Sequence, residues 1–453
     1  MSFISDTEAE ALGAFLSRRA VLGATAASGL LATPLAAFAQ GTAASGPGEA
    51  EITVDQARQA PIPIVIPNFG AGLGDQISGV ITSDLDGTGL FKVMSGDVAP
   101  DGTPDFAGLK ARGARAAVAG RALGSGSVRV EMRLWDVVAG QQLQGTAYTA
   151  SSSNWRRIAH IIADVIYERM LGEKGYFDTR IAYIARTGPR HHQITRLALM
   201  DQDGANERML TGGQWLTLTP RFNPVRDQVA FLSYANNRPR VYLFDLASGR
   251  QQVLGEFNGI SFAPRFSPDG SRVVLSATRG SGSDIYVVDL ASGSKRQITS
   301  SGGAIDTSPC FSPDGSQIVF NSDRGGSPQL YIMSASGGGA KRISYGSGQY
   351  GSPVWSPRGD LIAFTRIGSG GFSLGVMNPD GTGERILTQG FTVEGASFCP
   401  NGRVLAFCRQ SASGAGGAGF ASGIGTIDIT GFNERPIRTS TGASDPAWSP
   451  RNG

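Results

Sequence analysis

The pentapeptide Phe266-Ser267-Pro268-Asp269-Gly270, FSPDG, decides the fold of this chain because it recurs along the sequence. It stands again at residues 311–315, and looser copies begin at four other aromatic residues. The spacings between successive copies are 44, 45, 44, 43 and 50 residues. A period in the low forties, made of short strands and tight turns, predicts a β-propeller with one four-stranded blade per repeat. The six copies begin at Phe222, Phe266, Phe311, Trp355, Phe398 and Trp448.

The same plan of strands and turns surrounds each copy. The aromatic residue ends an inner strand, and a proline stands two residues before it in five of the six copies. Ser-Pro-Asp-Gly suits a type I turn, because proline fixes φ at its second position and glycine accepts the left-handed conformation. Strands rich in Val, Ile, Tyr and Phe follow, as at 272–277 and 284–290, and a short outer strand such as 295–299 completes the blade.

The last copy is incomplete, and this predicts how the ring closes. After Ser444 the sequence supplies only one inner strand, whereas residues 180–211 supply three strands and no inner one. Pairing of the C-terminal strand with residues 180–186 would complete a sixth blade and cover two open sheet edges. The alternative is an open array of five repeats with an unpaired tail. We therefore expect an all-β six-bladed β-propeller over residues 180–453, closed by the last strand.

Residues 60–175 predict a small α/β domain in front of the propeller. Strands are expected at 61–69, 90–95 and 114–123, followed by a hairpin that turns at Val138–Gly140. Apolar residues at helical spacing predict one helix after Asp75 and another over residues 154–171. Residues 172–179 then join this domain to the propeller.

The first residues have the composition of an export signal. Arg18 and Arg19 precede a small, apolar run over 20–37, and AFA at 37–39 offers a cleavage site. This arrangement predicts a twin-arginine-like signal over residues 1–39, with an ordinary secretory signal as the alternative. Either signal would take the chain out of the cytoplasm. Residues 40–59 are small and polar, so we expect a flexible N-terminal segment there.

Charge and cysteine usage exclude several classes of function. The net charge is only +3, with no Lys/Arg run after the N-terminus, which argues against nucleic-acid binding. The apolar run at 20–37 is too short and too rich in Ala and Gly for direct membrane insertion. Three cysteines at irregular spacing form no disulfide framework, so buried free thiols are expected, with a Cys399–Cys408 bond as the alternative to free Cys310, Cys399 and Cys408.

Histidines and acidic residues give no catalytic or metal-binding pattern. His160 is expected at the packing boundary of its helix. His191 and His192 are adjacent in a loop, without an acidic or cysteine partner nearby in sequence. Asp84-x-Asp86-Gly resembles the start of a calcium loop but lacks the later ligands. We predict no metal, no cofactor and no catalytic residue.

Two enzyme motifs match only formally. Gly371–Gly375 (GFSLG) fits the hydrolase elbow G-x-S-x-G, but that motif needs a helix after it and a blade strand follows here. Residues 414–419 (GAGGAG) fit the dinucleotide fingerprint, but they lie within a blade and outside any βαβ unit. Neither motif predicts an enzyme.

A propeller of this kind offers one mouth, surrounded by the loops that lead into its inner strands. The loops here combine acidic and apolar residues and contain no reactive group, which favours docking of a peptide or protein over catalysis. They end in Leu218-Thr219, Ile260–Ala263, Asp306-Thr307, Gly351-Ser352, Glu394 and Ser444-Asp445.

Several segments together resemble the TolB family, the periplasmic component of the Tol–Pal system of Gram-negative bacteria. They are the export signal, the segments IPIVIPNF (62–69) and DQISGVITSDLDGTGLF (75–91), the bridge ERMLGEKGYFDTRIAYI (168–184) and the six FSPDG-type blades. The resemblance covers essentially all of residues 51–450, and the bridge is its most specific part.

The resemblance implies a non-enzymatic, monomeric adaptor in the periplasm. Its propeller mouth would bind Pal, the peptidoglycan-associated lipoprotein, and the segment at the mature N-terminus would bind TolA. The role implied is support of outer-membrane integrity and of constriction during cell division, with other outer-membrane proteins as further candidate partners. On the Pal side Ala263 and Thr307 match the family in residue type, while Ile260 stands where a polar residue or histidine is usual. The implied contacts are Ile260, Ala263, Asp306, Thr307, Glu394 and Asp445 for Pal, and Glu51, Ile52, Thr53 and Val54 for TolA.

Two functions of other classes remain as alternatives. A hydrolase of the prolyl-peptidase kind would need a further domain carrying Ser, Asp and His on an α/β-hydrolase sheet. A periplasmic glycan-binding lectin would need an aromatic-rich mouth, and Tyr350 is the only obvious candidate there.

Overall fold

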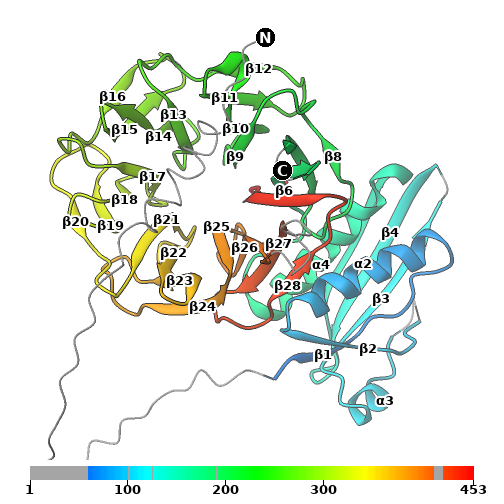
Figure 1. The fold of residues 1–453 in the computed structure, drawn as a ribbon. Helices are drawn as coiled ribbons and strands as arrows, with labels where there is room; N and C mark the ends of the chain where they lie inside the picture. The colour runs from blue at the N-terminus through cyan, green and yellow to red at the C-terminus, as the bar shows by residue number, and fades with distance from the viewer. Residues whose placement is uncertain (1–59, 100–102, 125, 190–191, 413–421, 453) are drawn as a thin grey trace, which may run out of the picture. The chain divides into compact units, whose positions relative to one another are not determined.

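The computed structural model describes residues 60–99, 103–124, 126–189, 192–412 and 422–452, and these form a small α/β domain followed by a ring of six blades (Figure 1). The export signal and the flexible segment predicted over residues 1–59 lie outside the described residues. In the described residues, no helix has the length and apolar character needed to cross a membrane.

The α/β domain has a five-stranded sheet with the strand order β2-β1-β3-β4-β5. β1 is parallel to β2 and β3, whereas β3, β4 and β5 form an antiparallel meander. The predicted helices and hairpin are present, and the sequence interpretation missed the short helix α3. The elements are β1 Ile62–Val65, α2 Leu73–Gly87, β2 Phe91–Met94, α3 Phe106–Ala111, β3 Ala116–Leu123, β4 Ser127–Asp136, β5 Gln141–Ser151 and α4 Trp155–Leu171.

Helices α2 and α4 pack against each other and share the apolar core of this domain. Ile77 and Ile81 of α2 and Ile162 of α4 are fully buried in that core. The same core continues into the propeller through the buried Tyr183 and Trp448. The domain and the ring therefore bury apolar surface together, which stabilises both.

The propeller consists of six four-stranded antiparallel sheets, as the repeat predicted. Five sheets use consecutive strands, and their innermost strands surround the centre of the ring in Figure 1. The strands are β9 Thr217–Phe222, β10 Gln228–Ser233, β11 Arg240–Asp245 and β12 Gln251–Val253; β13 Ser261–Phe266, β14 Arg272–Arg279, β15 Gly282–Asp289 and β16 Lys295–Gln297; β17 Asp306–Phe311, β18 Gln317–Ser322, β19 Gln329–Ser334 and β20 Lys341–Arg342; β21 Gln349–Trp355, β22 Ile362–Gly368, β23 Gly371–Met377 and β24 Arg385–Gly390; β25 Thr392–Phe398, β26 Val404–Gln410, β27 Ser422–Asp428 and β28 Arg435–Ile437.

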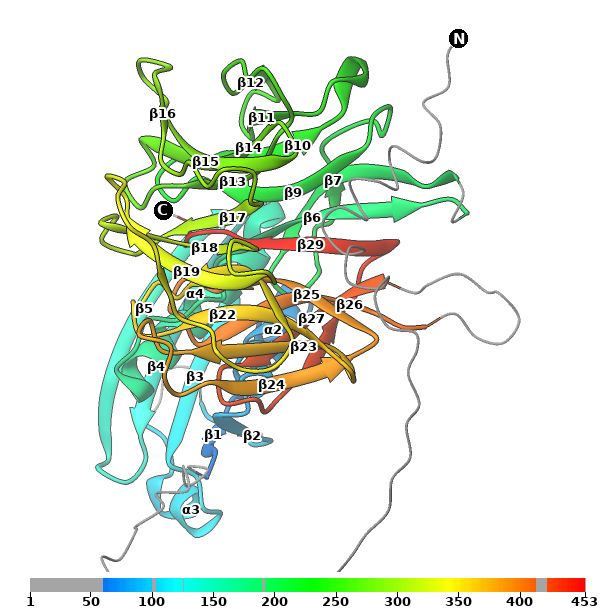
Figure 2. The ribbon, with the colours of Figure 1, turned by 60° about the vertical axis from the view of Figure 1, so that its left-hand side comes forward.

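The sixth blade is built from both ends of the propeller sequence, with the strand order β29-β6-β7-β8. Its strands are β6 Arg180–Thr187, β7 Ile194–Asp201, β8 Arg208–Met209 and β29 Gly442–Trp448. Both views show β29, in red, beside the green β6 (Figures 1 and 2). The Trp448 indole donates a hydrogen bond to Thr179 Oγ1 at 2.8 Å, and Ser449 exchanges two hydrogen bonds with Arg180. The predicted ring closure is confirmed.

The FSPDG turn connects each inner strand to the next strand of its blade. Gly270 N–H donates to Ser267 O at 2.8 Å, and Gly270 has a φ of 65°, so the turn has the predicted left-handed glycine. The Ser267 hydroxyl accepts the Arg272 N–H at 2.9 Å and donates to Asp269. That hydrogen bond, with others from Ser271, lowers the pKa of Asp269 to about 2. A Cβ on Gly270 would lie 2.4 Å from Asn223 Oδ1 of the neighbouring blade, so glycine also permits adjacent turns to pack.

Candidate functional site

The six innermost strands share a β-bulge, close in sequence to the loops that define the predicted mouth. In every blade the pairing register shifts at the same place, two to three residues before the terminal aromatic residue. The first bulge residue has a left-handed backbone with φ between 49° and 69°. All six of these residues are half-buried, and a proline follows five of them. They are Thr219, Ala263, Ser308, Ser352, Gly395 and Asp445.

Two physical features explain why the sequence forms these bulges. Proline has no N–H to donate, so it fits where the ladder is interrupted and would weaken a regular inner strand. Only Gly395 adopts its backbone conformation without steric cost, and the other five residues cost about 1–2 kcal/mol each. Strain of this kind persists only where the surrounding structure enforces it, and it clusters at binding sites. The bulge positions are therefore rigidly held, and five of the six blades present one side chain at an equivalent position.

One side of the mouth is acidic and lies where the fifth and sixth blades meet. Burial and repulsion by Asp445 raise the pKa of Glu394 to about 7, although Arg186 opposes the shift. Arg186 donates to Ser444 Oγ at 2.8 Å, and its guanidinium lies 3.8 Å from the Asp445 carboxylate. Two carboxylates thus share one guanidinium, and near neutral pH the proton occupancy of Glu394 is variable. This corner can accept a cationic or hydrogen-bonding group from a partner.

The remaining residues proposed for the mouth differ in accessibility. Ile260 is half-buried, and its backbone is fixed by two hydrogen bonds to Thr278 at 2.8 and 2.9 Å. Thr307 is 5% exposed, and its hydroxyl has no hydrogen-bond partner within the described residues. Asp306 is fully buried and accepts two hydrogen bonds of 2.9 Å from Arg324. Ser301 Oγ also donates to this carboxylate at 2.9 Å, so Asp306 can influence a partner only through these neighbours. Glu51, Ile52, Thr53 and Val54 lie outside the described residues.

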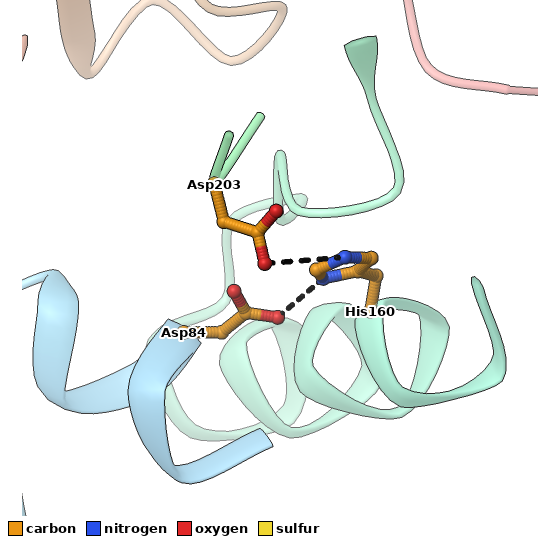
Figure 3. Close-up of side chains that lie close together, drawn as sticks. All are labelled: Asp84, His160 and Asp203. Carbon is orange, nitrogen blue, oxygen red and sulfur yellow. Dashed lines mark hydrogen bonds and ion pairs between the residues drawn. The ribbon is translucent and has the colours of Figure 1, made fainter. Parts of the chain in front are cut away.

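A second polar cluster joins the α/β domain to the propeller (Figure 3). His160 of α4 faces Asp84 of α2 through Nδ1 at 2.6 Å and Asp203, after β7, through Nε2 at 3.8 Å. His160 is 2% exposed, so the expectation that it lies at a packing boundary was wrong. The cause is Asp84, whose carboxylate gives the imidazole a partner inside the core. Burial opposes the imidazolium charge, but the charge and hydrogen bond of Asp84 outweigh it and raise the pKa of His160 to about 9.

Among the residues that the structure describes, these three have potential ligand atoms close enough together to hold a metal ion. The atoms lie within 4.8 Å of one another. However, Arg156 forms an ion pair with Asp203, and His160 carries a positive charge at neutral pH. The two carboxylates are thus balanced by cations of the protein itself. The donor set therefore fits a buried charge network that connects the two parts of the molecule. Asp84 lies within α2, so the calcium-loop motif is not a loop.

The formal enzyme motifs do not form sites in the described residues. Ser373 lies within β23, paired with Arg366 and Gln389 on the neighbouring strands, and no helix follows it. A nucleophile elbow requires a strand-to-helix turn, so Ser373 is a structural residue. The dinucleotide-like motif at 414–419 lies outside the described residues, as does His191. The three cysteines are free and buried, as expected.

Sequence reasoning missed two parts of these sites. Arg186 was not singled out, although its pairing with Gly442 places it beside the mouth once the ring closes. Ser308 was also missed, and a search for the residue three positions before each aromatic would have found it. The cluster around His160 gives no local signal, because Asp84 and His160 are 76 residues apart in sequence.

Comparison with known proteins identifies the family. A family profile described as the TolB beta propeller domain matches residues 167–452, and one described as the TolB amino-terminal domain matches residues 50–143. A Tol-Pal system protein TolB from Gluconobacter oxydans (strain 621H) is 90% identical over 453 residues, which is 100% of both chains. The chain belongs to the TolB family.

A crystal structure of TolB from Acinetobacter baumannii agrees with this assignment. It superposes with a TM-score of 0.75 at 27% sequence identity and covers 86% of this chain and 97% of that chain. Members of the TolB family are non-enzymatic periplasmic components, and membership places the role of this chain in the Tol–Pal system. The expected resemblance and fold class are thereby confirmed.

Proposed function

We propose that this chain is a non-enzymatic adaptor that binds Pal at the propeller mouth and TolA through the segment Glu51–Val54. In this role it supports outer-membrane integrity and constriction during cell division. The observation that carries the Pal part is the ring of six equivalent bulges, which holds one half-exposed side chain on each of five blades, and Gly395 on the sixth, on a rigid frame. Pre-organised surfaces bind with less loss of conformational freedom, so such a mouth suits a folded partner.

Within this proposal the predicted Pal contacts have different tasks. Ala263 lies on a bulge and leaves room for a partner side chain, while Asp445 and Glu394 supply the acidic corner. Ile260 and Thr307 flank these positions on the loop and strand beside the bulge. Asp306 holds Arg324 in place beneath them.

The Pal contact is tested by placing a bulky side chain at the mouth. Ala263→Arg should weaken binding of purified Pal at least tenfold in isothermal titration calorimetry, because the guanidinium would occupy the space of a partner residue. Ala247→Arg is the matched control, since Ala247 is exposed in the turn between β11 and β12, away from the mouth. Equal affinity of both variants for Pal would contradict the proposed site.

The TolA contact is tested separately on the exported chain. Deletion of Glu51–Val54 should abolish capture of the purified periplasmic domain of TolA and leave Pal affinity within twofold. Replacement of the same four residues by Gly-Ser-Gly-Ser controls for the loss of length. Retained TolA binding in both variants would exclude this segment, whatever the Pal measurement gives.

A further inference from the structure

The inner strands have a second repeated position, which points into the channel on the propeller axis. It is the residue directly before each aromatic. All six such residues line one cavity of about 300 Å³, together with the six aromatic residues and the six prolines that begin the turns. Because every blade contributes, this cavity lies on the axis of the ring. The six residues are Arg221, Arg265, Cys310, Val354, Ser397 and Ala447.

The only charged side chains that line this cavity are two arginines. Arg221 is on β9 and Arg265 is on β13, so they stand on adjacent blades. The rest of the lining is aromatic, aliphatic, proline, serine and cysteine. The cavity is therefore an open, mostly apolar pocket with positive charge on one side.

Neither guanidinium has a carboxylate partner among the described residues. Arg221 Nη1 donates to the backbone oxygen of Pro220 at 2.6 Å, and no ion pair neutralises its charge. Burial and the charge of Arg265 lower the pKa of Arg221 to about 9, with a weaker opposing attraction from Asp445. Burial also lowers the pKa of Arg265. Arginine keeps its proton in proteins, so two like charges share a half-buried space.

The fold itself does not need arginine at this position. In two of the other four blades the residue accepts a hydrogen bond from the next blade: Cys310 Sγ accepts the Trp355 N–H at 3.4 Å, and Ser397 Oγ accepts the Trp448 N–H at 2.9 Å. A guanidinium has only donors and cannot do this. Val354 and Ala447 fill the position in the remaining two blades without any polar group. Arg221 and Arg265 therefore place charge without an ion-pair partner where the other blades have a small neutral residue.

We propose that Arg221 and Arg265 form a binding site for a small oxyanion, a carboxylate or phosphate group, within the propeller channel. Guanidinium groups match the geometry of both oxyanions, and charge-assisted hydrogen bonds are strongest where water is largely excluded. An anion between the two groups would also relieve their repulsion. The volume of about 300 Å³ admits a molecule of the size of citrate. The site uses the residue directly before each aromatic, whereas the proposed Pal contacts stand three or more residues before it.

The test is anion binding to the exported chain at constant ionic strength, with chloride as the balancing ion. Inorganic phosphate and citrate are titrated separately, by calorimetry and by the midpoint of thermal unfolding. We expect a saturable rise in the midpoint with at least one of them. Saturation by phosphate alone assigns a phosphoryl ligand, and saturation by citrate alone assigns a carboxylate ligand. A midpoint that responds equally to chloride would overturn the proposal.

The variant Arg221→Gln/Arg265→Gln should bind the effective anion at least tenfold more weakly. The exposed pair Arg238→Gln/Arg250→Gln removes the same net charge elsewhere and should bind as the parent does. Since the channel variant loses a repulsion, its own thermal midpoint should not fall. If the double variant does not fold, Arg265→Gln alone is measured. Unchanged anion affinity in the folded channel variant would refute the site.

Discussion

Thr219 shows at the scale of one residue how this propeller stores strain. It is β-branched and yet has a φ of 49°, a region where such side chains meet the backbone. Its hydroxyl is buried without a hydrogen-bond partner among the described residues, so no hydrogen bond of this side chain offsets the backbone strain. The conformation is imposed by the bulge and by Pro220.

We therefore expect Thr219→Gly to stabilise the protein by about 1 kcal/mol, because glycine adopts this φ without clash and the gain exceeds its extra chain entropy. The free energy of unfolding from urea titration measures the effect. Thr392→Gly is the control, since Thr392 begins β25 in a regular conformation and its replacement should cost about 0.5–1 kcal/mol. A loss of stability in Thr219→Gly would show that the bulge is not strained.

Sequence spacing alone placed Ala263 and Asp445 near the mouth, because a fixed distance from each aromatic defines the strand position. It could not show that this position is left-handed, since proline after it permits several backbone conformations. It also could not show that Asp306 is buried, because its partner Arg324 comes 18 residues later in the sequence, after the next strand of the blade.

At the scale of elements, the repeated turn and the closing strand define the ring. The turn is recognisable in sequence because each of its residue types favours a turn for a local reason. Pro fixes φ, Gly accepts a positive φ, and the Ser and Asp side chains form hydrogen bonds with the nearby backbone. The closing strand was predictable because residues 180–211 lacked an inner strand and β29 lacked outer ones. Helix α3 was missed because six residues give no readable apolar period.

We expect Trp448→Ala to destabilise the protein by about 3–5 kcal/mol, as for other buried large-to-small changes. The variant removes a side chain that is 6% exposed and its hydrogen bond to Thr179. Trp215→Ala is the matched control, because Trp215 is 40% exposed and should change stability by about 0.5 kcal/mol or less. Similar denaturation midpoints for the two variants would mean that β29 does not hold the ring closed.

At the scale of the whole described structure, the buried charge network of Asp84, His160 and Asp203 connects the α/β domain to the propeller. Asp84 accepts from Gln202 at 2.9 Å, and the Asn433 side chain donates to Gly87 O at 2.7 Å. No sequence pattern could reveal this junction, because its partners come from segments that are remote in the chain and are joined only by tertiary packing.

Because His160 is protonated in this network, we expect the free energy of unfolding to decrease at alkaline pH. The pKa of His160 is about 9 in the folded state and 6.5 without its partners, so the folded state binds the extra proton between these values. The stabilisation is complete below pH 6.5 and disappears as the pH rises through 9.

Urea unfolding at pH 6.5 and pH 9.5 measures the difference. His160→Gln should remove most of the dependence between these pH values, whereas His192→Gln, at an exposed position, should leave it unchanged. An unaltered pH dependence in His160→Gln would assign the effect to another group.

Closure by β29 also sets the time at which the molecule can finish folding. Trp448 and its partner Thr179 are 269 residues apart. At about 5–20 residues per second this separation takes the ribosome roughly 13–54 s to synthesise. Once β8 has been made, the nascent blade has three strands, and the edge of β6 stays open to mispairing until β29 follows. The topology therefore leaves this edge uncovered until the last strand emerges.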